Sequence, residues 1–267
     1  MSLRVVSLNT WGGRVFAPLI AFVESIHGDV LCLQEVFSAP ATDIESVQDS
    51  DGHHVRVNLF QDLQQRLPEH AGFFYPFAKG YLNDTNTTEL PVFYGIATFV
   101  RKTISIVTSL AGFVFGEFRD GQSHESQMPR NAHGVRLVDG EHNATFAVAH
   151  THGLWDRRGK FDTDERIVQT ANLVALLDHL CQPKDKIVVC GDFNVLPSSS
   201  LFHALRSKRL EDLVVRTGIT DTRTSYYSKS LRYADYMLVS PEVGVTRFAV
   251  RQSPEVSDHR PLILDCE

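Results

Sequence analysis

The chain has 267 residues, of which 43% are hydrophobic and 22% charged, and this is the composition of an ordinary soluble globular protein. The formal net charge of −6 argues mildly against a protein that coats nucleic acid. It does not exclude an enzyme that acts on nucleic acid through a local basic rim and bound cations. No stretch is long and apolar enough to cross a bilayer, which argues against stable membrane insertion.

The sequence shows no repeat, no low-complexity run and no Gly/Ser/Pro-rich linker, so we expect one domain over residues 1–267. Its start lacks the charged-then-apolar pattern of a secretion signal, and its four cysteines are scattered without a Cys-x-x-Cys spacing. These features predict reduced cysteines in or near the core and a cytoplasmic location. Nothing resembles a coiled-coil seam; the oligomeric state stays open, with a monomer favoured.

The N-terminal segment predicts a β-α-β unit. Residues 3–8 form an apolar strand that ends at Asn9, and residues 16–27 carry apolar side chains at helical spacing. Residues 30–33 form a second buried strand, which runs into Glu35. The unit therefore presents an asparagine at its first strand end and a glutamate at its second.

The middle of the chain predicts strands between polar loops and one helix. We expect loops at residues 38–53, 80–91 and 120–130. Between them we expect a helix at residues 55–67 and strands at residues 73–77, 95–100 and 104–118. Residues 110–118 are strongly apolar and aromatic. The alternation of Phe113, Phe115 and Glu117 with their neighbours favours a buried strand, and an exposed lipid-docking loop is the alternative.

The C-terminal half repeats the pattern of polar residues at segment ends. A hairpin of residues 135–138 and 144–150 leads into His152, and the clearest helix spans 164–180. The strand 186–190 runs into Gly191-Asp192-Phe193-Asn194. Short helical pieces follow at residues 201–205 and 210–215, and then strands at residues 234–239, 245–250 and 262–264. Asp235 lies at the start of the first of these strands, and Asp258-His259 precedes the last.

Many strands with both β-α-β and hairpin connections predict mixed sheets in an α/β or α+β protein. About ten strands are too many for one comfortable open sheet. Two sheets packed face to face with helices outside are the natural arrangement.

The segment ends together carry carboxylates, carboxamides and histidines, namely Asn9, Glu35, His152, Asp192, Asn194, Asp235, Asp258 and His259. Buried charges cost several kcal/mol each unless they are paired or bind metal, so this set is poorly explained by stability alone. Oxygen ligands without cysteine suit Mg²⁺ first and Mn²⁺ second. A histidine beside carboxylates suits acid–base work near neutral pH. Together these groups indicate metal-assisted attack of water on a phosphoester.

These motifs resemble the endonuclease/exonuclease/phosphatase superfamily, which includes DNase I-like nucleases, apurinic-site endonucleases, neutral sphingomyelinases and inositol-polyphosphate phosphatases. They occur in the order of the family and span residues 9–261. The resemblance implies a four-layered α/β sandwich with its site at one end of the two packed sheets.

The resemblance also implies roles for individual residues. Glu35 would ligate Mg²⁺ beside Asn9, and Asp258 would hold the metal or its water. Asp192 would orient or deprotonate the attacking water, while His259, oriented by Asp235, would stabilise the phosphoryl transition state or act as the base. Asn194 would hold a phosphate oxygen, and His152 would contact the phosphate or help to protonate the leaving group. Which of Asp192 and His259 is the base stays open.

Several further residues have both a functional and a structural interpretation. His150 lies two residues from His152 and could share its face, but packing is favoured. Arg130 and Asn131 could reach a phosphate or lie in a plain surface loop. In the long helix, Arg166 and Gln169 are expected to tie the helix to a sheet. Three basic residues follow the strand that ends at His152, namely Arg157, Arg158 and Lys160. They could form a basic rim of the site or a solvated run of charges.

We therefore expect a Mg²⁺-dependent phosphoester hydrolase, first of all a phosphodiesterase with a nucleic-acid or related substrate. A lipid or small-molecule phosphoesterase is the alternative, suggested by the net charge and the aromatic residues 110–118. An inactive binding module with the same fold is a third possibility, and the filled catalytic positions argue against it.

Overall fold

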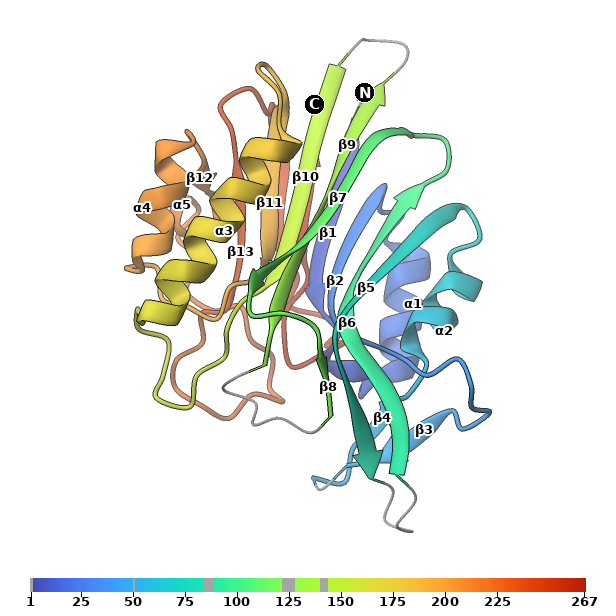
Figure 1. The fold of residues 1–267 in the computed structure, drawn as a ribbon. Coiled ribbons are helices and arrows are strands. Elements are labelled where there is room, and N and C mark those ends of the chain that lie inside the picture. Colours follow the sequence, from blue (N-terminus) through green and yellow to red (C-terminus); the bar gives the residue numbers. More distant parts are fainter. Residues whose placement is uncertain (1, 50, 84–88, 122–127, 140–143) are drawn as a thin grey trace.

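The structure is a computed structural model, and it describes residues 2–49, 51–83, 89–121, 128–139 and 144–267. Two mixed β-sheets lie face to face between two groups of helices (Figure 1). The first sheet has the order β14-β15-β1-β2-β6-β5-β8. Its strands are β1 (Leu3–Asn9), β2 (Val30–Ser38), β5 (His70–Asn83), β6 (Glu89–Arg101), β8 (Arg119–Asp120), β14 (Val245–Val250) and β15 (Leu262–Cys266).

The second sheet has the order β12-β13-β11-β10-β9-β7. Its strands are β7 (Ser105–Phe115), β9 (Arg130–Asp139), β10 (Ala144–His152), β11 (Lys186–Asp192), β12 (Glu211–Asp212) and β13 (Asp235–Val239). A separate small hairpin joins β3 (Ser46–Gln48) to β4 (His54–Arg56).

The helices cover the outer faces of the two sheets (Figure 1). A short 3-10 helix, η1 (Trp11–Gly13), precedes α1 (Phe16–Ser25), which lies with α2 (Leu59–Arg66) on the first sheet. The second sheet carries α3 (Asp164–Leu180), α4 (Ser200–Ser207) and α5 (Leu213–Arg216). This confirms the expected four-layered α/β sandwich. Among the described residues, no helix has the length and apolar character required to span a membrane.

Strand β1 shows how the layers are held together. Its side chains alternate between faces, so Val6 and Leu8 pack with α1 while Leu3 and Val5 pack in the cluster between the sheets. Both faces are therefore buried, which explains why the strand is apolar throughout. The cysteines are free, and three of them, Cys32, Cys190 and Cys266, lie in this interior, as expected.

Local structure departs from expectation around α2 and at the β5–β6 pair. The helix expected at 55–67 begins only at Leu59, because residues 54–56 pair with β3. The loop expected at 80–91 is largely strand, since β5 and β6 stay paired from His70↔Arg101 to Asn83↔Glu89, with its centre outside the described residues. The pairing uses backbone hydrogen bonds, which the side-chain pattern of the sequence does not reveal. The loop expected at 120–130 falls mostly outside the described residues.

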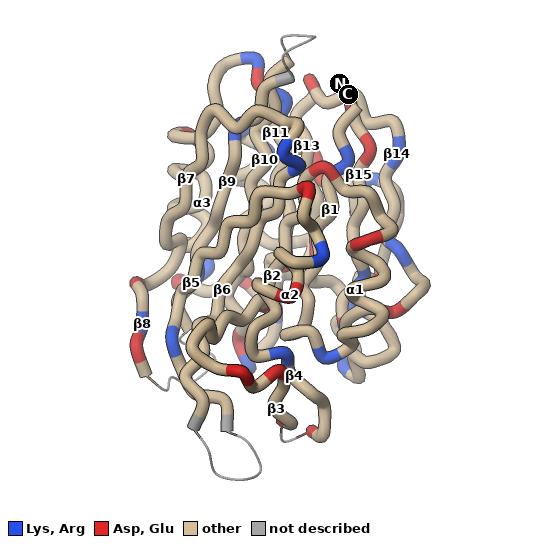
Figure 2. Tube along the Cα trace, turned by 90° about the vertical axis from the view of Figure 1, so that its right-hand side faces the viewer, with Lys and Arg blue, Asp and Glu red and all other residues tan. Residues whose placement is uncertain are grey.

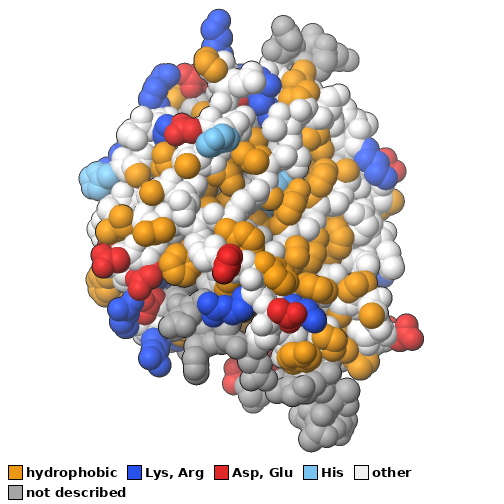
Figure 3. Space-filling view, viewed as in Figure 1, with side chains coloured by type: hydrophobic (Ala, Val, Ile, Leu, Met, Phe, Trp, Pro, Cys, Tyr) orange, Lys and Arg blue, Asp and Glu red, His pale blue; other side chains and the backbone are white. Residues whose placement is uncertain are grey.

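Strand β7 is more exposed than its sequence predicts. Val114 is fully buried, but Phe113 is 38% exposed and Phe118, which follows the end of β7, is 44% exposed, so the expectation of a buried strand is wrong for these side chains. The reason is the position of β7 at the edge of its sheet, interrupted by two irregularities in its pairing with β9. Figure 3 shows hydrophobic side chains gathered on this face of the molecule.

Candidate active site

Parallel and antiparallel pairing brings the predicted residues to one end of the sandwich. Because β10 and β11 are parallel, their carboxyl ends place His152 opposite Asp192, and antiparallel β13 begins there with Asp235 opposite Asp192. In the other sheet, β1 ends at Asn9, which pairs with Gln34 of the parallel strand β2. The first and last strands also pair, and Figure 2 shows the two chain ends beside one another at the opposite end of these strands.

A break in the β2–β6 pairing delivers Glu35 to the site. The register shifts between Leu33 and Val36, and Glu35 adopts a positive φ of 52°. A bulge of this kind re-aims a side chain that would otherwise follow the alternation of the strand. A non-glycine residue at positive φ is uncommon, and such strain is often retained at functional sites. Asn194, with φ of 53°, repeats this feature at the end of β11.

Gly191 permits the close approach of β11 to β10. Its φ is +135°, and a Cβ atom there would lie 2.1 Å from the backbone oxygen of Thr151. Any larger residue would push the two strands apart just before Asp192. The glycine of the Gly-Asp-Phe-Asn motif is therefore required by backbone geometry.

Asn9 links the two carboxylates nearest to it. Its Nδ2 donates to Glu35 Oε1 at 2.9 Å and to Asp192 Oδ2 at 3.1 Å, while its Oδ1 accepts from the Trp11 amide. Asp192 also accepts from the Asn194 amide at 3.0 Å. The amide side chain of Asn9 thus fixes the separation of Glu35 and Asp192.

His259 is held by a carboxylate and faces two more. Its Nδ1 donates to Asp235 Oδ2 at 2.8 Å, and its Nε2 lies 3.6 Å from Asp192 Oδ2 and 3.7 Å from Asp258 Oδ1. Burial and the Arg223 guanidinium pull the pKa of His259 down, but the three carboxylates outweigh them and raise it above its ordinary value. Asp192 shows the converse: burial favours its neutral form, yet the nearby histidines and cations lower its pKa.

His152 is the neutral histidine of the cluster. Its Nε2 is 3.7 Å from Asp192 Oδ2 and 3.9 Å from Glu35 Oε1, and its Nδ1 has no hydrogen-bond partner within the described residues. Burial, helped by Arg130, lowers its pKa to about 4 despite these carboxylates. A neutral imidazole with Nε2–H directed at the site can donate a hydrogen bond to a ligand.

Asp258 is paired with a residue that the sequence analysis missed. Arg223 Nη1 donates to Asp258 Oδ2 at 2.6 Å, and both side chains are nearly buried. Arg223 lies in an irregular stretch before β13 that forms an isolated bridge with His259. No periodic pattern marks this stretch, so only its chain position near Asp235 could have suggested a role.

The donor set fits a hard divalent cation. Glu35 and Asp258 repel one another, and burial together with Glu35 raises the pKa of Asp258 even though His259 and Arg223 oppose this. Each carboxylate has one oxygen that takes a short hydrogen bond, from Asn9 or Arg223, while the other oxygen of Asp258 has only a long contact of 3.5 Å with Ser257 Oγ. Carboxylate oxygens of this kind suit Mg²⁺ or Mn²⁺.

A second group of possible metal ligands lies beside these two carboxylates. Ligand atoms of Asp192, Asp235 and His259 lie within 4.8 Å of one another, which also makes them a possible metal group. However, His259 Nδ1 and the Asp235 oxygens already satisfy one another. Asp235 and His259 are therefore less available to a cation than the carboxylates of Glu35 and Asp258.

Some predicted residues lie elsewhere. His150 is buried between the sheets, where it contacts Gln34 and Thr98. Asn131 donates to the Tyr75 carbonyl. Arg130 lies closer to the site, since its Nε donates to the Gly153 carbonyl at 3.0 Å and its charge acts on His152. Arg130 and Asn131 begin β9 and are buried, so the plain surface loop considered for them is wrong.

The basic segment after β10 divides into different environments. Lys160 is buried and donates to the Tyr233 carbonyl, whereas Arg157 and Arg158 are exposed. The expected structural role of the α3 residues is confirmed. Arg166 donates to the carbonyls of Leu154 and Asn194, and Gln169 accepts from the Leu154 amide at 2.8 Å.

Comparisons with known proteins agree with this geometry. The sequence profile of the Endonuclease/Exonuclease/phosphatase family matches residues 6–259. Protein angel homolog 2 of Mus musculus is 24% identical over 252 residues, which is 92% of this chain and 40% of that protein. Its Homo sapiens counterpart is 24% identical over 257 residues, 92% of this chain and 41% of that protein. The chain therefore spans about two-fifths of the length of these curated relatives.

Solved structures share the fold at low identity. The human Nocturnin catalytic domain with bound sulfate has a TM-score of 0.70 at 21% identity, covering 100% of this chain and 94% of that one. The mannosyl-6-phosphatase of Bacteroides thetaiotaomicron has a TM-score of 0.67 at 18% identity, covering 99% of each chain. TDP2 of D. rerio with a single-strand DNA product has a TM-score of 0.65 at 15% identity, covering 100% and 99%.

Proposed function

The chain belongs to the Endonuclease/Exonuclease/phosphatase family, and from this premise we propose that it is a Mg²⁺-dependent phosphodiesterase, acting on nucleic acid or a related phosphodiester. The observation that carries the proposal is the His259–Asp235 couple, whose free Nε2 faces Asp192 at 3.6 Å. A buried histidine oriented by one carboxylate and aimed at another is the arrangement that hydrolysis by an activated water requires.

The charge states support a division of roles between Asp192 and His259. Asp192, with its lowered pKa, is ionised at neutral pH and orients the attacking water while accepting its proton in the transition state. His259, with its raised pKa, carries a proton on Nε2 and stabilises the negative charge that develops on the phosphoryl oxygens. Asp235 keeps the ring in this orientation.

Glu35 and Asp258 would hold the cation, with Asn9 beside them. A bound Mg²⁺ would draw electron density from a phosphoryl oxygen and so favour attack at phosphorus. Asn9 fixes Glu35 relative to Asp192, and Arg223 fixes Asp258. The contacts of Asn9 thus set the distance between Glu35, a proposed ligand of the cation, and Asp192, which positions the water.

Neutral donors complete the proposed site. His152, neutral because of burial, offers Nε2–H to a phosphate oxygen or to the leaving group. Asn194 holds a further phosphate oxygen, its backbone amide being fixed by Asp192. Both donors are rigidly placed, and such preorganised donors are effective in stabilising a transition state.

A second candidate function is hydrolysis of lipid or small-molecule phosphoesters. The exposure of Phe113 on β7 and of Phe118 just after it favours the lipid version, because exposed aromatic side chains can dock on a lipid surface. The proposed chemistry is the same for both candidates. They differ only in what surrounds the scissile phosphate.

A hydrolysis panel with Mg²⁺, and with EDTA as the control, tests the proposal. It would contain bis-(p-nitrophenyl) phosphate, p-nitrophenyl phosphate, oligonucleotides, sphingomyelin and inositol phosphates. We expect metal-dependent cleavage of the diesters. Cleavage of monoesters alone would contradict the phosphodiesterase proposal, and silence across the panel without Mg²⁺ binding would indicate an inactive binding module. The single domain, the monomeric state and the cytoplasmic location stay predictions from the sequence.

A further inference from the structure

A pocket of about 230 Å³ adjoins the catalytic cluster. We call it the Trp155 pocket, and its functional lining consists of Trp155, Arg157, Lys160, Asn194, Tyr227 and Lys229. Asn194 belongs to both the catalytic cluster and the Trp155 pocket, because its backbone amide donates to Asp192 and it also lines the pocket. The Tyr227 ring also links them, with the Arg223 guanidinium 4.2 Å and the Lys160 ammonium 5.9 Å from its centroid. A molecule held at the cluster can therefore extend into this pocket.

The Trp155 pocket carries excess positive charge in an acidic protein. Arg157 and Lys229 are exposed, and neither forms an ion pair within the described residues; Lys229 lies 5.5 Å from the Trp155 ring centroid. Buried Arg166, also in the lining, donates its hydrogen bonds to backbone carbonyls. The net charge of the chain is −6, so this concentration of cations is not a general property of its surface.

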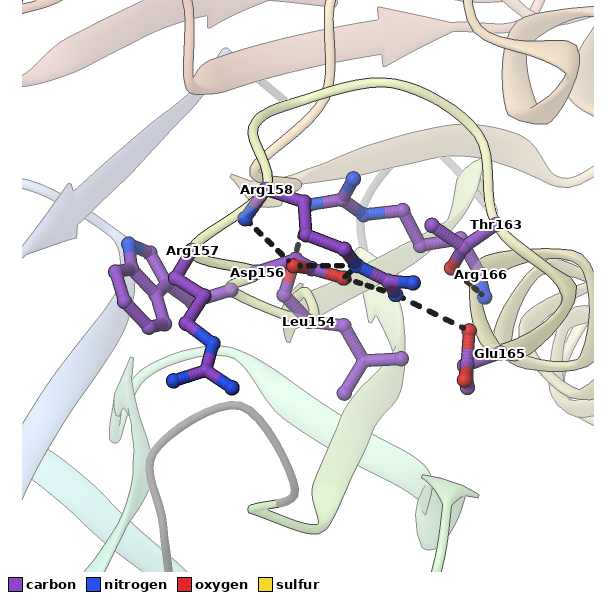
Figure 4. A pocket seen from close by; sticks show the side chains of 8 residues that line it. Leu154, Asp156, Arg157, Arg158, Thr163, Glu165 and Arg166 are labelled. Atoms are coloured by element: carbon purple, nitrogen blue, oxygen red, sulfur yellow. Dashed lines mark hydrogen bonds and ion pairs between the residues drawn. The ribbon is translucent and has the colours of Figure 1, made fainter.

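The carboxylate beside these cations is already neutralised. Asp156 lines the pocket, but Arg158 binds it at 2.5 Å, and this contact lowers the pKa of Asp156 to about 2. Figure 4, which shows the neighbouring pocket, has Arg158 directed at Asp156 and Glu165 while Arg157 extends away from them. Arg157 is therefore left available for a ligand.

Lys160 strengthens the case for an anion. Its amine is buried, donates to the Tyr233 carbonyl and makes no short ion pair within the described residues. Burial, opposed by Asp192 and Asp235, lowers the pKa of Lys160 to about 8. A buried ammonium group of this kind becomes more favourable when an anion lies near it.

We propose that the Trp155 pocket binds a second phosphate group of the substrate, next to the phosphate that is cleaved. The inference rests on the proposed phosphodiesterase function and narrows its substrate class to phosphoesters with two neighbouring phosphates. Arg157 and Lys229 provide exposed charged donors, while buried Lys160 provides a fixed one. The second phosphate comes either from a nucleic-acid backbone or from a small bisphosphate.

Kinetics with matched substrates test the proposal. A 5′-phosphorylated thymidine dinucleotide and glycerophosphoinositol 4-phosphate, which are both phosphodiesters with a second phosphate, are each compared with the counterpart that lacks the second phosphate. In the double variant Arg157→Gln/Lys229→Gln, we expect kcat/KM to fall about tenfold more for the substrate with two phosphates. The variant Arg157→Lys keeps the charge, so it should retain part of the preference for the substrate with two phosphates. The exposed control Arg247→Gln should leave kcat/KM unchanged for both substrates. The arm that responds identifies the source of the phosphate, and an equal fall for both members of each pair would overturn the proposal.

A binding measurement separates this inference from the proposed function. Inorganic pyrophosphate is titrated by calorimetry into protein freed of metal by EDTA and dialysis, in which the catalytic carboxylates repel anions. We expect binding by the native chain and by Arg247→Gln, and binding about tenfold weaker in the double variant. If no substrate is hydrolysed, this titration alone decides the role of the pocket. Equal pyrophosphate affinity in the native chain and the double variant would refute it.

Discussion

Two pairs of buried histidines lie close together in this protein, and only one of the four imidazoles, His259, has a raised pKa. The site pair is His152 and His259, and the core pair is His133 and His150 between the sheets. Strand β10 carries one member of each pair, since His150 and His152 are two residues apart. The comparison separates the effect of burial on an imidazole from the effect of its neighbours.

The core pair is surrounded by neutral groups. Thr98 Oγ1 lies 2.6 Å from His133 Nδ1 and 2.8 Å from His150 Nε2. His133 Nε2 contacts Ser109 Oγ at 2.9 Å, and His150 Nδ1 contacts Gln34 Nε2 at 3.1 Å. Burial lowers the pKa of His133 to about 4, and burial with the His133 charge lowers the pKa of His150 well below its ordinary value. Burial alone keeps an imidazole neutral.

His259 is as buried as the core pair, yet its pKa is raised, because Asp235, Asp258 and Asp192 outweigh the cost of desolvation. The nearby His152 faces only Glu35 and Asp192 at 3.7 Å or more and stays neutral. A carboxylate in direct contact therefore decides which buried histidine can carry charge.

Loss of a carboxylate at the site should have the largest effect. Glu35→Gln keeps the size of the side chain and its contact with Asn9 but removes the proposed metal ligand. We expect weaker Mg²⁺ binding by calorimetry and a fall in kcat of about 10³-fold or more. The exposed control Glu69→Gln should retain both properties. Full Mg²⁺ affinity in Glu35→Gln would show that the cation lies elsewhere, for example at Asp192, Asp235 and His259.

Removal of the charged histidine should come next. His259→Gln deletes the imidazolium but leaves Glu35 and Asp258 in place, so Mg²⁺ binding should persist. We expect kcat to fall by about 10²- to 10³-fold, equivalent to about 3–4 kcal/mol of barrier. The exposed control His203→Gln should be fully active. Equal losses of Mg²⁺ affinity in His259→Gln and Glu35→Gln would mean that the two roles have been misassigned.

A substitution that removes hydrogen bonds from the core pair should lower the stability of the protein and leave its catalysis nearly unchanged. Thr98→Val has nearly the same shape but leaves a nitrogen of both His133 and His150 without a partner. We expect the free energy of unfolding to fall by about 2 kcal/mol or more, while kcat of the folded protein changes little. Denaturant unfolding measures this, with the exposed Thr108→Val as the matched control. A large loss of kcat with unchanged stability would place the core pair in the catalytic site.

The smallest effect is a pH dependence of stability. A histidine with a lowered pKa binds fewer protons when folded, so stability is full above the unfolded pKa of about 6.5 and falls as the pH drops toward 4. For His133 the loss between pH 7.5 and 5 is about 2 kcal/mol. The variant His133→Gln should lose less stability over this range than His203→Gln. Equal slopes in the two variants would contradict a neutral His133.

Much of the fold and the site could be predicted because the informative residues stand at strand ends. Asn9, Asp192 and Asp235 follow or begin apolar runs, and parallel or antiparallel pairing then brings them together. The spacing of His150 and His152 predicts that they share a face of the strand. It does not predict how far each lies from the end of the sheet, and in the structure His152 lies in the site and His150 in the core. Arg223 gave no local signal, and the length of β5 and β6 depends on backbone pairing that side-chain pattern does not record.

The hydrogen-bonded series through the core pair has a direction. Gln34 Nε2 donates to the Cys32 carbonyl at 3.0 Å, which fixes the orientation of the amide and makes His150 Nδ1 an acceptor. His150 Nε2–H must then donate to Thr98, Thr98 to His133 Nδ1, and His133 Nε2–H to Ser109. One backbone carbonyl of β2 thus selects the tautomer of two imidazoles on neighbouring strands. No single residue of the series can exchange its donor and acceptor atoms without breaking a hydrogen bond to its neighbour. The polar contact between the two sheets is therefore cooperative, since all its hydrogen bonds depend on one another.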